Sequence, residues 1–279
     1  MHQVNNHKAR LVIVAAGLGS RLAPLTNSIP KFLINIGKNT GYVEMIRYWQ
    51  TQVDLEDYPL TVIVHSKYSN LVNEYHNLYF PDIKLIIKEV DVANGSAHAI
   101  MTSCHHLNGE AVTFSWCDVI AKDSLPADYD ADNCVNTIFT NYNNSNRYDL
   151  KATYGPYVVP VIDENERGGC FGLYHIGNFD TTKATFVDGQ DFIEIIPQFG
   201  KIIECELDKI IDFGDMPKLK HTRASADKAR EFNSVEMIGD YVLKKATNDQ
   251  GKGLIQRELA WYKQLTELVE IKEVEKVYD

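Results

Sequence analysis

Two glycines and two basic residues lie close together in the segment LVIVAAGLGSRLAPLTNSIPKFL, which covers residues 11–33. Gly17 and Gly19 have no side chains, so the backbone N–H groups around them can approach an anion closely. Arg21 and Lys31 supply two positive charges to the same anion. The triphosphate of a nucleotide is the anion that this combination favours, so the segment is predicted to bind one.

Two better-known glycine loops do not fit this segment. A Walker-type loop needs four residues between its glycines and then Gly-Lys-Ser/Thr, a pattern that is absent here. A dinucleotide-binding loop needs a third glycine three positions after the second, where this chain has Leu22. The segment is therefore predicted to be a nucleotide-binding loop of a different kind.

The spacing resembles the signature of the sugar-phosphate nucleotidyltransferases, which reads G-x-G-S/T-R-L-x-P-L-T-x-x-x-P-K-x-L. The matching residues are Gly17, Gly19, Ser20, Arg21, Leu22, Pro24, Leu25, Thr26, Pro30, Lys31 and Leu33. The resemblance implies transfer of a nucleoside monophosphate from a nucleoside triphosphate to a phosphorylated acceptor, with release of pyrophosphate. It implies catalytic roles for Arg21, Lys31 and Asp118. The residues implied to contact the nucleotide in this segment are Ala15, Ala16, Gly17, Gly19, Ser20 and Arg21.

Two aspartates are implied to hold a divalent cation. A transfer between two phosphates brings anions together, and Mg²⁺, which prefers carboxylate oxygens, would neutralise them. Asp118 directly follows an expected strand over residues 111–116, although Cys117 replaces the glycine that the family has before this aspartate. The later segment IIDFGDMP resembles the family's Asp-x-Gly-Thr/Asp element, which makes Asp212 the second ligand. Asp215 is predicted instead to cap the helix that follows.

The loop that would read the base departs from the family's pattern. Asn94, Gly95 and Ser96 resemble the loop in which a glycine backbone lies against the base and opens a helix that faces the nucleotide. The family usually has a glutamine where this chain has Val90. The choice among CTP, UTP and dTTP therefore stays open.

The loop that would bind the acceptor also departs from the pattern. Family members often carry a Glu-Lys-Pro lysine there, and this chain has none. Arg167 is the candidate cation in its place, with a solvated turn as the alternative interpretation of this residue. Lys31 and Gly172, which lies on the following strand, are also implied to contact the acceptor.

The hydrophobic pattern predicts the elements that must position these residues. Apolar runs typical of buried strands cover residues 11–16, 60–65, 83–87 and 111–116, and helical spacing covers 41–53 and 96–106. Further strands are expected over 135–140, 152–162, 170–176 and 201–213, and a helix over 191–199. Strands that alternate with helices favour a Rossmann-like (GT-A-like) α/β fold, with a mixed, mostly parallel sheet and helices on both faces. Ligands bind beyond the carboxyl ends of such strands, where the glycine loop and Asp118 both fall.

The character of the chain changes near residue 234. The chain is predicted to divide into a nucleotidyltransferase domain over residues 1–233 and a small C-terminal appendage over 234–279. A strand is expected over 241–246 and an amphipathic helix over 253–268. A strand lysine followed by Glu258 resembles the start of a choline-kinase-like lobe. A docking or dimerising element, which would make a homo-oligomer, is the other interpretation.

Composition narrows the partners. The formal net charge of −10 predicts no general attraction to nucleic acid or to anionic membranes. No apolar run approaches the ~20 residues of a membrane span, and the first such run leads into the glycine loop, which favours a strand over a signal peptide. Five scattered cysteines without a C-x-x-C pair are typical of reduced thiols, so a cytoplasmic location is predicted.

Several functions are compatible with these sequence features. A sugar 1-phosphate acceptor would give an NDP-sugar for glycan or capsule biosynthesis, whereas phosphocholine or another small phospho-alcohol would give a CDP-alcohol. A glycosyltransferase with the same Rossmann-like half would require an Asp-x-Asp motif where this chain has Asp118-Val-Ile. A non-catalytic nucleotide-sensing domain would be favoured had Arg21, Lys31 or Asp118 been lost, and all three are present.

Overall fold

The computed structural model describes residues 9–92, 94–125, 135–143, 146–165, 167–227, 233–238 and 241–264. The chain divides into two compact units, the first ending at Thr222 and the second starting at Arg223. The division falls inside helix α5 (Met216–Asp227), ahead of the predicted boundary at residue 233. The first turn of α5 belongs to the first unit because its Leu219 is fully buried in the core there.

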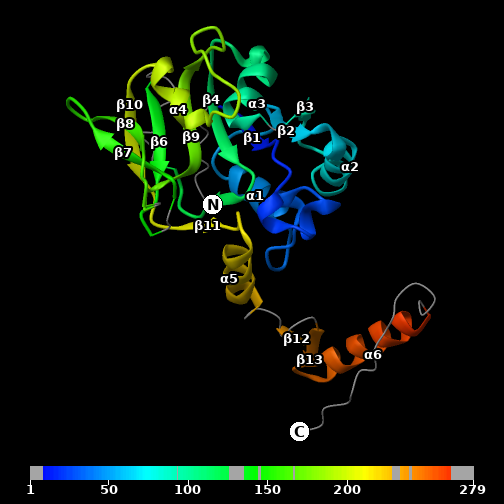
Figure 1. Cartoon of the computed structure of the whole chain (residues 1–279). Coiled ribbons are helices and arrows are strands. Elements are labelled where there is room, and N and C mark those ends of the chain that lie inside the picture. The colour runs from blue at the N-terminus through cyan, green and yellow to red at the C-terminus, as the bar shows by residue number, and fades with distance from the viewer. Residues whose placement is uncertain are drawn as a thin grey trace. The chain divides into compact units, whose positions relative to one another are not determined.

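The first unit is built on a nine-stranded sheet with the order β3-β2-β1-β4-β9-β6-β10-β8-β7 (Figure 1). Its strands are β1 (Arg10–Ala15), β2 (Leu60–His65), β3 (Leu85–Val90), β4 (Glu110–Trp116), β6 (Asn136–Thr140), β7 (Tyr148–Ala152), β8 (Tyr157–Ile162), β9 (Cys170–Phe179) and β10 (Ile202–Glu206). Strands β3, β2, β1 and β4 pair in parallel, as do β6 and β10. Strands β9, β8 and β7 pair antiparallel with their neighbours. The predicted Rossmann-like mixed α/β sheet with helices is confirmed. The expectation that the sheet is mostly parallel holds only for β3, β2, β1 and β4 and for the β6–β10 pair, because β9, β8 and β7 run antiparallel to their neighbours.

Helices cover both faces of this sheet. They are α1 (Gly41–Trp49), α2 (Ser69–Tyr79), α3 (Gly95–Ser103), α4 (Phe192–Ile195) and the first part of α5. Short 3₁₀ turns lie at Ser20–Leu22, Leu25–Asn27, Lys31–Leu33, Ser66–Tyr68, His105–Leu107 and Ile196–Phe199. Side chains alternate along β1: Leu11 and Ile13 belong to the buried cluster that holds Trp49 of α1, whereas Val12 belongs to the cluster that holds Ile100 of α3. A strand buried on both faces needs the continuous apolar run that β1 has.

The chain turns in two places where an unbroken strand was expected. The predicted strand over 152–162 is part of the β7–β8 hairpin, whose turn contains Gly155 at φ +67°. The predicted strand over 201–213 is split into β10 and β11 (Ile210–Asp212). Strand β11 leaves the main sheet and pairs antiparallel with β5 (Val119–Ala121), directly after Asp118. The sequence marks both turns, the first with Gly155 and Pro156 and the second with Asp208 and Lys209, but the apolar runs on either side led to a single strand being expected in each case.

The second unit contains an antiparallel hairpin and a helix. The hairpin joins β12 (Asn233–Ile238) to β13 (Tyr241–Ala246), and the helix is α6 (Asp249–Gln264). The predicted strand over 241–246 is confirmed, and the predicted helix begins earlier than expected, at Asp249. The side chain of Glu258 lies outside the described residues, so the likeness to a kinase lobe stays a prediction. In the described part of the chain, none of the helices combines the length and the apolar character needed to cross a membrane.

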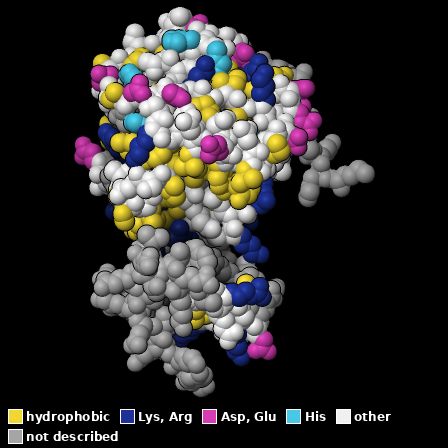
Figure 2. Space-filling model, turned by 90° about the vertical axis from the view of Figure 1, so that its right-hand side faces the viewer, with side chains coloured by type: hydrophobic (Ala, Val, Ile, Leu, Met, Phe, Trp, Pro, Cys, Tyr) yellow, Lys and Arg dark blue, Asp and Glu magenta, His cyan; other side chains and the backbone are white. Residues whose placement is uncertain are grey.

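The surface of the first unit carries charges of both signs. On the face that Figure 2 shows, Lys and Arg side chains are interspersed with Asp and Glu side chains and do not form a patch of one sign. Such a surface does not create the one-sign field that attracts a polyanion over a distance.

Candidate active site

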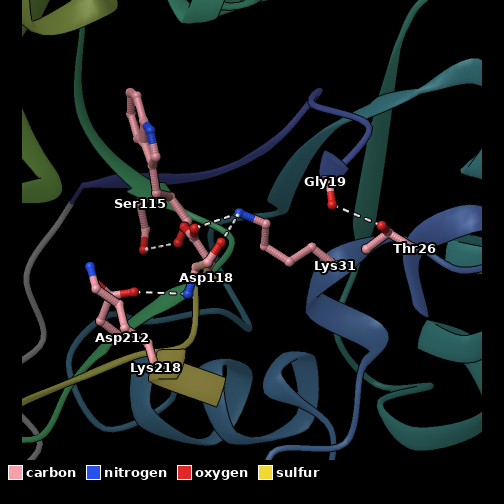
Figure 3. Close-up of polar contacts among 9 residues, drawn as sticks. Gly19, Thr26, Lys31, Ser115, Asp118, Asp212 and Lys218 are labelled. Carbon is pink, nitrogen blue, oxygen red and sulfur yellow. Dashed lines mark hydrogen bonds and ion pairs between the residues drawn. The ribbon is translucent and has the colours of Figure 1, made fainter. Parts of the chain in front are cut away.

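The glycine loop follows β1 and is held by contacts from the turns beside it. Gly19 has φ +69°, and a Cβ there would lie 2.8 Å from Cγ2 of Thr26, so only glycine fits without strain. The hydroxyl of Thr26 donates to the carbonyl of Gly19 at 2.8 Å (Figure 3). Tyr68, in turn, donates its hydroxyl to the carbonyl of Thr26 at 2.7 Å. Contacts within the protein therefore fix the shape of the loop.

This loop forms one wall of a cleft of about 270 Å³, called here the nucleotide cleft. Its lining residues are Val14, Ala16, Gly17, Gly19, Arg21, Lys31, Gly95, Ser96, Trp116, Cys117 and Asp118. Most of the predicted nucleotide contacts and all three predicted catalytic residues meet here. Ala15, Ser20 and Asn94 do not line the cleft, and the side chain of Ala15 is buried in the opposite face of the sheet.

The start of α3 is docked against the loop that precedes α4. Gly95 has φ +86°, and a Cβ there would lie 2.5 Å from the carbonyl oxygen of Gln190. The hydroxyl of Ser96 accepts a hydrogen bond from the backbone N–H of Phe192 at 2.8 Å and lies 3.3 Å from Asp191 Oδ1. The N-terminus of α3, with its partial positive charge, is thereby fixed at the edge of the nucleotide cleft.

Asp118 and Asp212 lie together although nearly a hundred residues separate them in the sequence. The β5–β11 pairing aligns Asp212 with Val119, and the backbone N–H of Phe213 donates to the carbonyl of Asp118 at 3.0 Å. A Cβ on Gly214 would lie 2.6 Å from Asp118 Oδ2 and 3.1 Å from Asp212 Oδ1. Both carboxylates therefore face one point, and glycine keeps that point open.

Two lysines neutralise these carboxylates from opposite sides (Figure 3). Lys31 Nζ lies 2.7 Å from Asp118 Oδ2 and also donates to the carbonyl of Gly214 at 3.3 Å. Lys218 Nζ, from the first turn of α5, lies 2.5 Å from Asp212 Oδ2. The side chains of Lys31 and Asp118 are only 11% and 10% exposed, so their ion pair is shielded from water.

The two carboxyl groups have opposite pKa shifts. Burial opposes ionisation of Asp118, but the Lys31 ammonium, helped by Arg21, outweighs it and holds the pKa of Asp118 below its usual range. Burial and the negative charge of Asp118 raise the pKa of Asp212, and Lys218 offsets only part of that rise. The two carboxylates thus repel each other, because both carry negative charge and face one point.

The residues at this point suit a divalent cation. Carboxylate oxygens are the ligands that hard cations prefer, and a cation between Asp118 and Asp212 would relieve their repulsion. Among the described residues, no group of three or more His, Cys, Asp and Glu side chains could enclose a metal ion. A cation held here would take its remaining ligands from phosphate oxygens and water, which is how Mg²⁺ commonly binds beside nucleotides.

A second cleft, of about 310 Å³, adjoins the nucleotide cleft at Asp118 and is called here the acceptor cleft. It shares Arg21, Trp116 and Asp118 with the nucleotide cleft. Its other lining residues are Val119, Asn146, Arg147, Tyr148, Cys170, Phe171, Gly172, Tyr174, Asp191, Ile193, Asp212, Gly214 and Lys218. Gly172, predicted from the sequence, has φ +96° and leaves room for the ring of Trp116, which a Cβ would approach to 2.8 Å.

A network of polar side chains forms the end of the acceptor cleft away from Asp118 and Asp212. The hydroxyl of Tyr148 lies 2.8 Å from Asp191 Oδ2 and 2.5 Å from Glu194 Oε1. Burial and these two carboxylates raise the pKa of Tyr148. The guanidinium of Arg147 lies over the Tyr148 ring at 5.2 Å and 3.4 Å from Asp191. None of these residues was identified from the sequence, because they come from separate segments and follow no local motif.

Arg167 does not reach the site for which it was predicted. It is exposed, its backbone N–H donates to Asp163 Oδ2 at 2.7 Å in a tight turn, and it lines neither cleft. Arg147 lies in the acceptor cleft instead. Asp215 behaves as predicted: its carboxylate accepts the backbone N–H of Lys218 at 2.9 Å and caps α5.

The fold and the paired clefts define a nucleotide-binding α/β protein whose glycine loop faces a carboxylate pair across one sheet edge. The family model described as "Nucleotidyl transferase" matches residues 10–159, and the chain belongs to this family. Membership supports nucleotidyl-transfer activity, and the family generally uses a divalent metal.

Individual relatives cover different shares of the chain. The bifunctional protein GlmU of Methanococcus aeolicus is 27% identical over 148 residues, which is 53% of this chain and 32% of that protein. The chain thus spans about a third of the length of this curated relative.

Two solved structures share the fold at low identity. UDP-glucose pyrophosphorylase in complex with UDP-glucose has a TM-score of 0.61 at 13% identity, with 80% of this chain and 99% of that chain covered. CTP:phosphocholine cytidylyltransferase from Streptococcus pneumoniae has a TM-score of 0.56 at 14% identity, covering 78% and 98%.

Proposed function

We propose that this chain transfers a nucleoside monophosphate from a nucleoside triphosphate to a phosphorylated acceptor and releases pyrophosphate. The observation that carries this proposal is the position of Asp118, which lines both clefts. The nucleotide cleft offers a preformed glycine loop and two cations to a triphosphate. The acceptor cleft adjoins the same carboxylate, so an acceptor phosphate bound there would lie close to the α-phosphate of the nucleotide.

The residues of the nucleotide cleft have distinct tasks in this reaction. Backbone N–H groups around Gly17 and Gly19, together with Arg21, bind the β- and γ-phosphates and stabilise the charge that develops on the departing pyrophosphate. Lys31 binds the α-phosphate and helps to bring the acceptor to it. An oxygen of the acceptor phosphate bonds to the α-phosphorus as the bond from that phosphorus to the β-phosphate oxygen breaks. The attacking phosphate is already an anion, so no side chain has to activate it.

Asp118 and Asp212 would hold Mg²⁺. Bound there, the cation would neutralise the triphosphate and polarise the α-phosphate. The two carboxylates supply hard oxygens at one point, and the nearby lysines lower the charge of the site enough for two anionic substrates to enter. This assignment also explains why Gly214 is needed, since a larger residue would fill the point between the ligands.

A sugar 1-phosphate is the first candidate acceptor, and an NDP-sugar the product. UDP-glucose pyrophosphorylase, whose structure holds UDP-glucose, shares the fold across most of this chain. The far end of the acceptor cleft suits a sugar because Asp191 can accept hydrogen bonds from hydroxyl groups. The aromatic side chains of Trp116 and Tyr174, 5.1 Å apart in an edge arrangement, offer apolar surface to a ring.

Phosphocholine or a similar phospho-alcohol is the second candidate, favoured by one specific observation. The acceptor cleft lies beside two carboxylates, Asp191 and Glu194, and is lined by the rings of Trp116, Tyr148 and Tyr174. Aromatic faces beside carboxylates are the surroundings that a quaternary ammonium prefers. The product would then be a CDP-alcohol, and the CTP:phosphocholine cytidylyltransferase that shares this fold acts on such an acceptor.

A pyrophosphate-release screen tests the proposal. Each of CTP, UTP, dTTP, ATP and GTP is combined with glucose 1-phosphate, N-acetylglucosamine 1-phosphate, phosphocholine and phosphoethanolamine in the presence of Mg²⁺. We expect turnover with one acceptor class, and that class decides between the two candidates. Nucleotide binding by calorimetry without turnover in any combination would overturn the proposal and support a nucleotide-sensing domain.

A further inference from the structure

The proposed reaction needs a cation for the acceptor phosphate, because that phosphate must approach another anion closely. Three cationic residues line the acceptor cleft among the described residues: Arg21, Arg147 and Lys218. Lys31 lines the nucleotide cleft and is paired with Asp118. One of these three cations has to bind the attacking phosphate in the acceptor cleft.

Two of these residues are placed for other partners. Arg21 follows the glycine loop and lines both clefts, so the triphosphate occupies it. Arg147 belongs to the far end of the cleft, with its side chain 57% exposed and paired with Asp191 across the ring of Tyr148. Lys218 is the remaining cation, with a side chain only 31% exposed and its ammonium 2.5 Å from Asp212 Oδ2.

The backbone that carries Lys218 is held firmly, whereas its side chain can turn. Asp215 caps the helix through the backbone N–H of Lys218, and Leu219, the next residue, is completely buried. Figure 3 shows the side chain of Lys218 beside Asp212, on the other side of the carboxylate pair from Lys31. A flexible four-carbon stem on a fixed helix turn lets the ammonium move between partners near one point.

We propose that Lys218 binds the phosphate of the acceptor; this rests on the proposed function. The ammonium is paired with Asp212 in the structure. A divalent cation on Asp212 would compete for the carboxylate that pairs with Lys218, and the ammonium, which also lines the acceptor cleft, can pair with the phosphate of an acceptor bound there. Lys31 and Lys218 then serve the two anions from opposite sides of the carboxylate pair, one for the nucleotide and one for the acceptor.

Steady-state kinetics separate this role from a purely structural one. In Lys218→Met, we expect the KM for the acceptor on which the wild type turns over to rise roughly 10- to 100-fold, as for a lost charged hydrogen bond. The KM for the nucleotide should stay within about threefold, and Lys218→Arg should recover part of the loss. Lys220→Met is the matched control, because Lys220 is exposed on the same helix and lines neither cleft.

A binding cycle provides a readout that does not depend on turnover. Calorimetry compares a phosphorylated compound with its dephosphorylated partner, glucose 1-phosphate with glucose or phosphocholine with choline, in the presence of Mg²⁺. The wild type should prefer the phosphorylated compound, and Lys218→Met should lose most of that preference. The affinity for the dephosphorylated compound should change little, because only the phosphate meets the lysine.

The possible outcomes separate a failure of the proposed function from a failure of the role proposed for Lys218. If the wild type turns over no acceptor, the proposed function itself fails. An active wild type, with Lys218→Met changing only the Mg²⁺ concentration needed and leaving the acceptor KM unaltered, would show that Lys218 serves Asp212 alone. That result would overturn the inference and leave the proposed function standing. A higher acceptor KM together with a lost phosphate preference would support it.

Discussion

The two clefts on either side of Asp118 are built in different ways. The nucleotide cleft is formed largely by one continuous segment, residues 11–33, and by backbone groups at Gly17 and Gly19. The acceptor cleft is formed by side chains from β9, β11, α5 and the segments around Arg147 and Asp191. Backbone groups bind any triphosphate in the same manner. Side chains from scattered segments can be substituted one at a time, and each substitution can change which acceptor fits. The predicted triphosphate-binding groups thus come largely from one local segment, whereas the acceptor cleft and the Asp118–Asp212 pair depend on contacts between distant segments.

Asp118→Asn should have the largest effect because both clefts share this carboxylate. Loss of the charge removes the partner of Lys31 and half of the metal site, so pyrophosphate release should fall by at least ~10³-fold with every acceptor. Adding EDTA to the wild type should give a similar loss. Circular dichroism checks that the variant is folded. Activity within about tenfold of the wild type would contradict a shared role for this residue.

Gly214→Ala should come next, since it fills the point that both carboxylates face. The new methyl group would lie 2.6 Å from Asp118 Oδ2 and 3.1 Å from Asp212 Oδ1. Overpacking of this kind costs ~1–3 kcal/mol, so kcat should fall roughly 10- to 100-fold and more Mg²⁺ should be needed. Gly253→Ala is the control, because a Cβ there meets nothing within 4 Å. Equal effects of both substitutions would argue against a metal site at this point.

A pair of glycine variants tests whether the two clefts are separate. Gly19→Ala strains the nucleotide loop at φ +69°, and Gly172→Ala strains β9 at φ +96° and presses on Trp116. Strain of ~1–3 kcal/mol should raise the KM for the nucleotide in the first variant, and for the acceptor in the second, by roughly tenfold. Initial-rate kinetics with each substrate varied in turn provide the measurement. If both variants raise the same KM, the division into two clefts is wrong.

Tyr148→Phe should have the smallest effect and should be confined to the acceptor cleft. It removes a hydroxyl that lies between Asp191 and Glu194. Loss of one such hydrogen bond should raise the acceptor KM about 3- to 10-fold and leave the nucleotide KM unchanged. Tyr142→Phe is the matched control, since Tyr142 also donates to a carboxylate, that of Glu204, but lines neither cleft. A change in nucleotide KM alone would place Tyr148 outside the acceptor site.

Much of the fold and half of the candidate site followed from local patterns. The apolar run before Gly17 predicts a buried parallel strand, and an aspartate directly after another such strand must lie at the same sheet edge. The family-specific spacing of Arg21 and Lys31 then indicates a triphosphate. Each of these inferences uses residues that are near neighbours in the sequence, where spacing and geometry are closely related.

The acceptor side could not be predicted in this way. Arg167 was the natural candidate because it stands where related loops carry a cation, yet a turn with Asp163 keeps it exposed and away from the cleft. Arg147 and Asp191 meet through side chains from segments far apart in the sequence. The sequence does not point to Lys218, because a lysine in the first turn of a helix is ordinarily solvated. Its contact with Asp212 appears only in the tertiary structure.

By itself, the sequence determined the α/β fold class and predicted a triphosphate-binding loop and two aspartates suited to a cation. The reason is that strand periodicity and a contiguous glycine loop are local properties. The tertiary structure alone decided that Asp212 lies beside Asp118. It also decided which cations, carboxylates and aromatic rings line the acceptor cleft. Those features depend on the β5–β11 pairing and on the packing of α5, which are contacts between distant segments that no short pattern specifies.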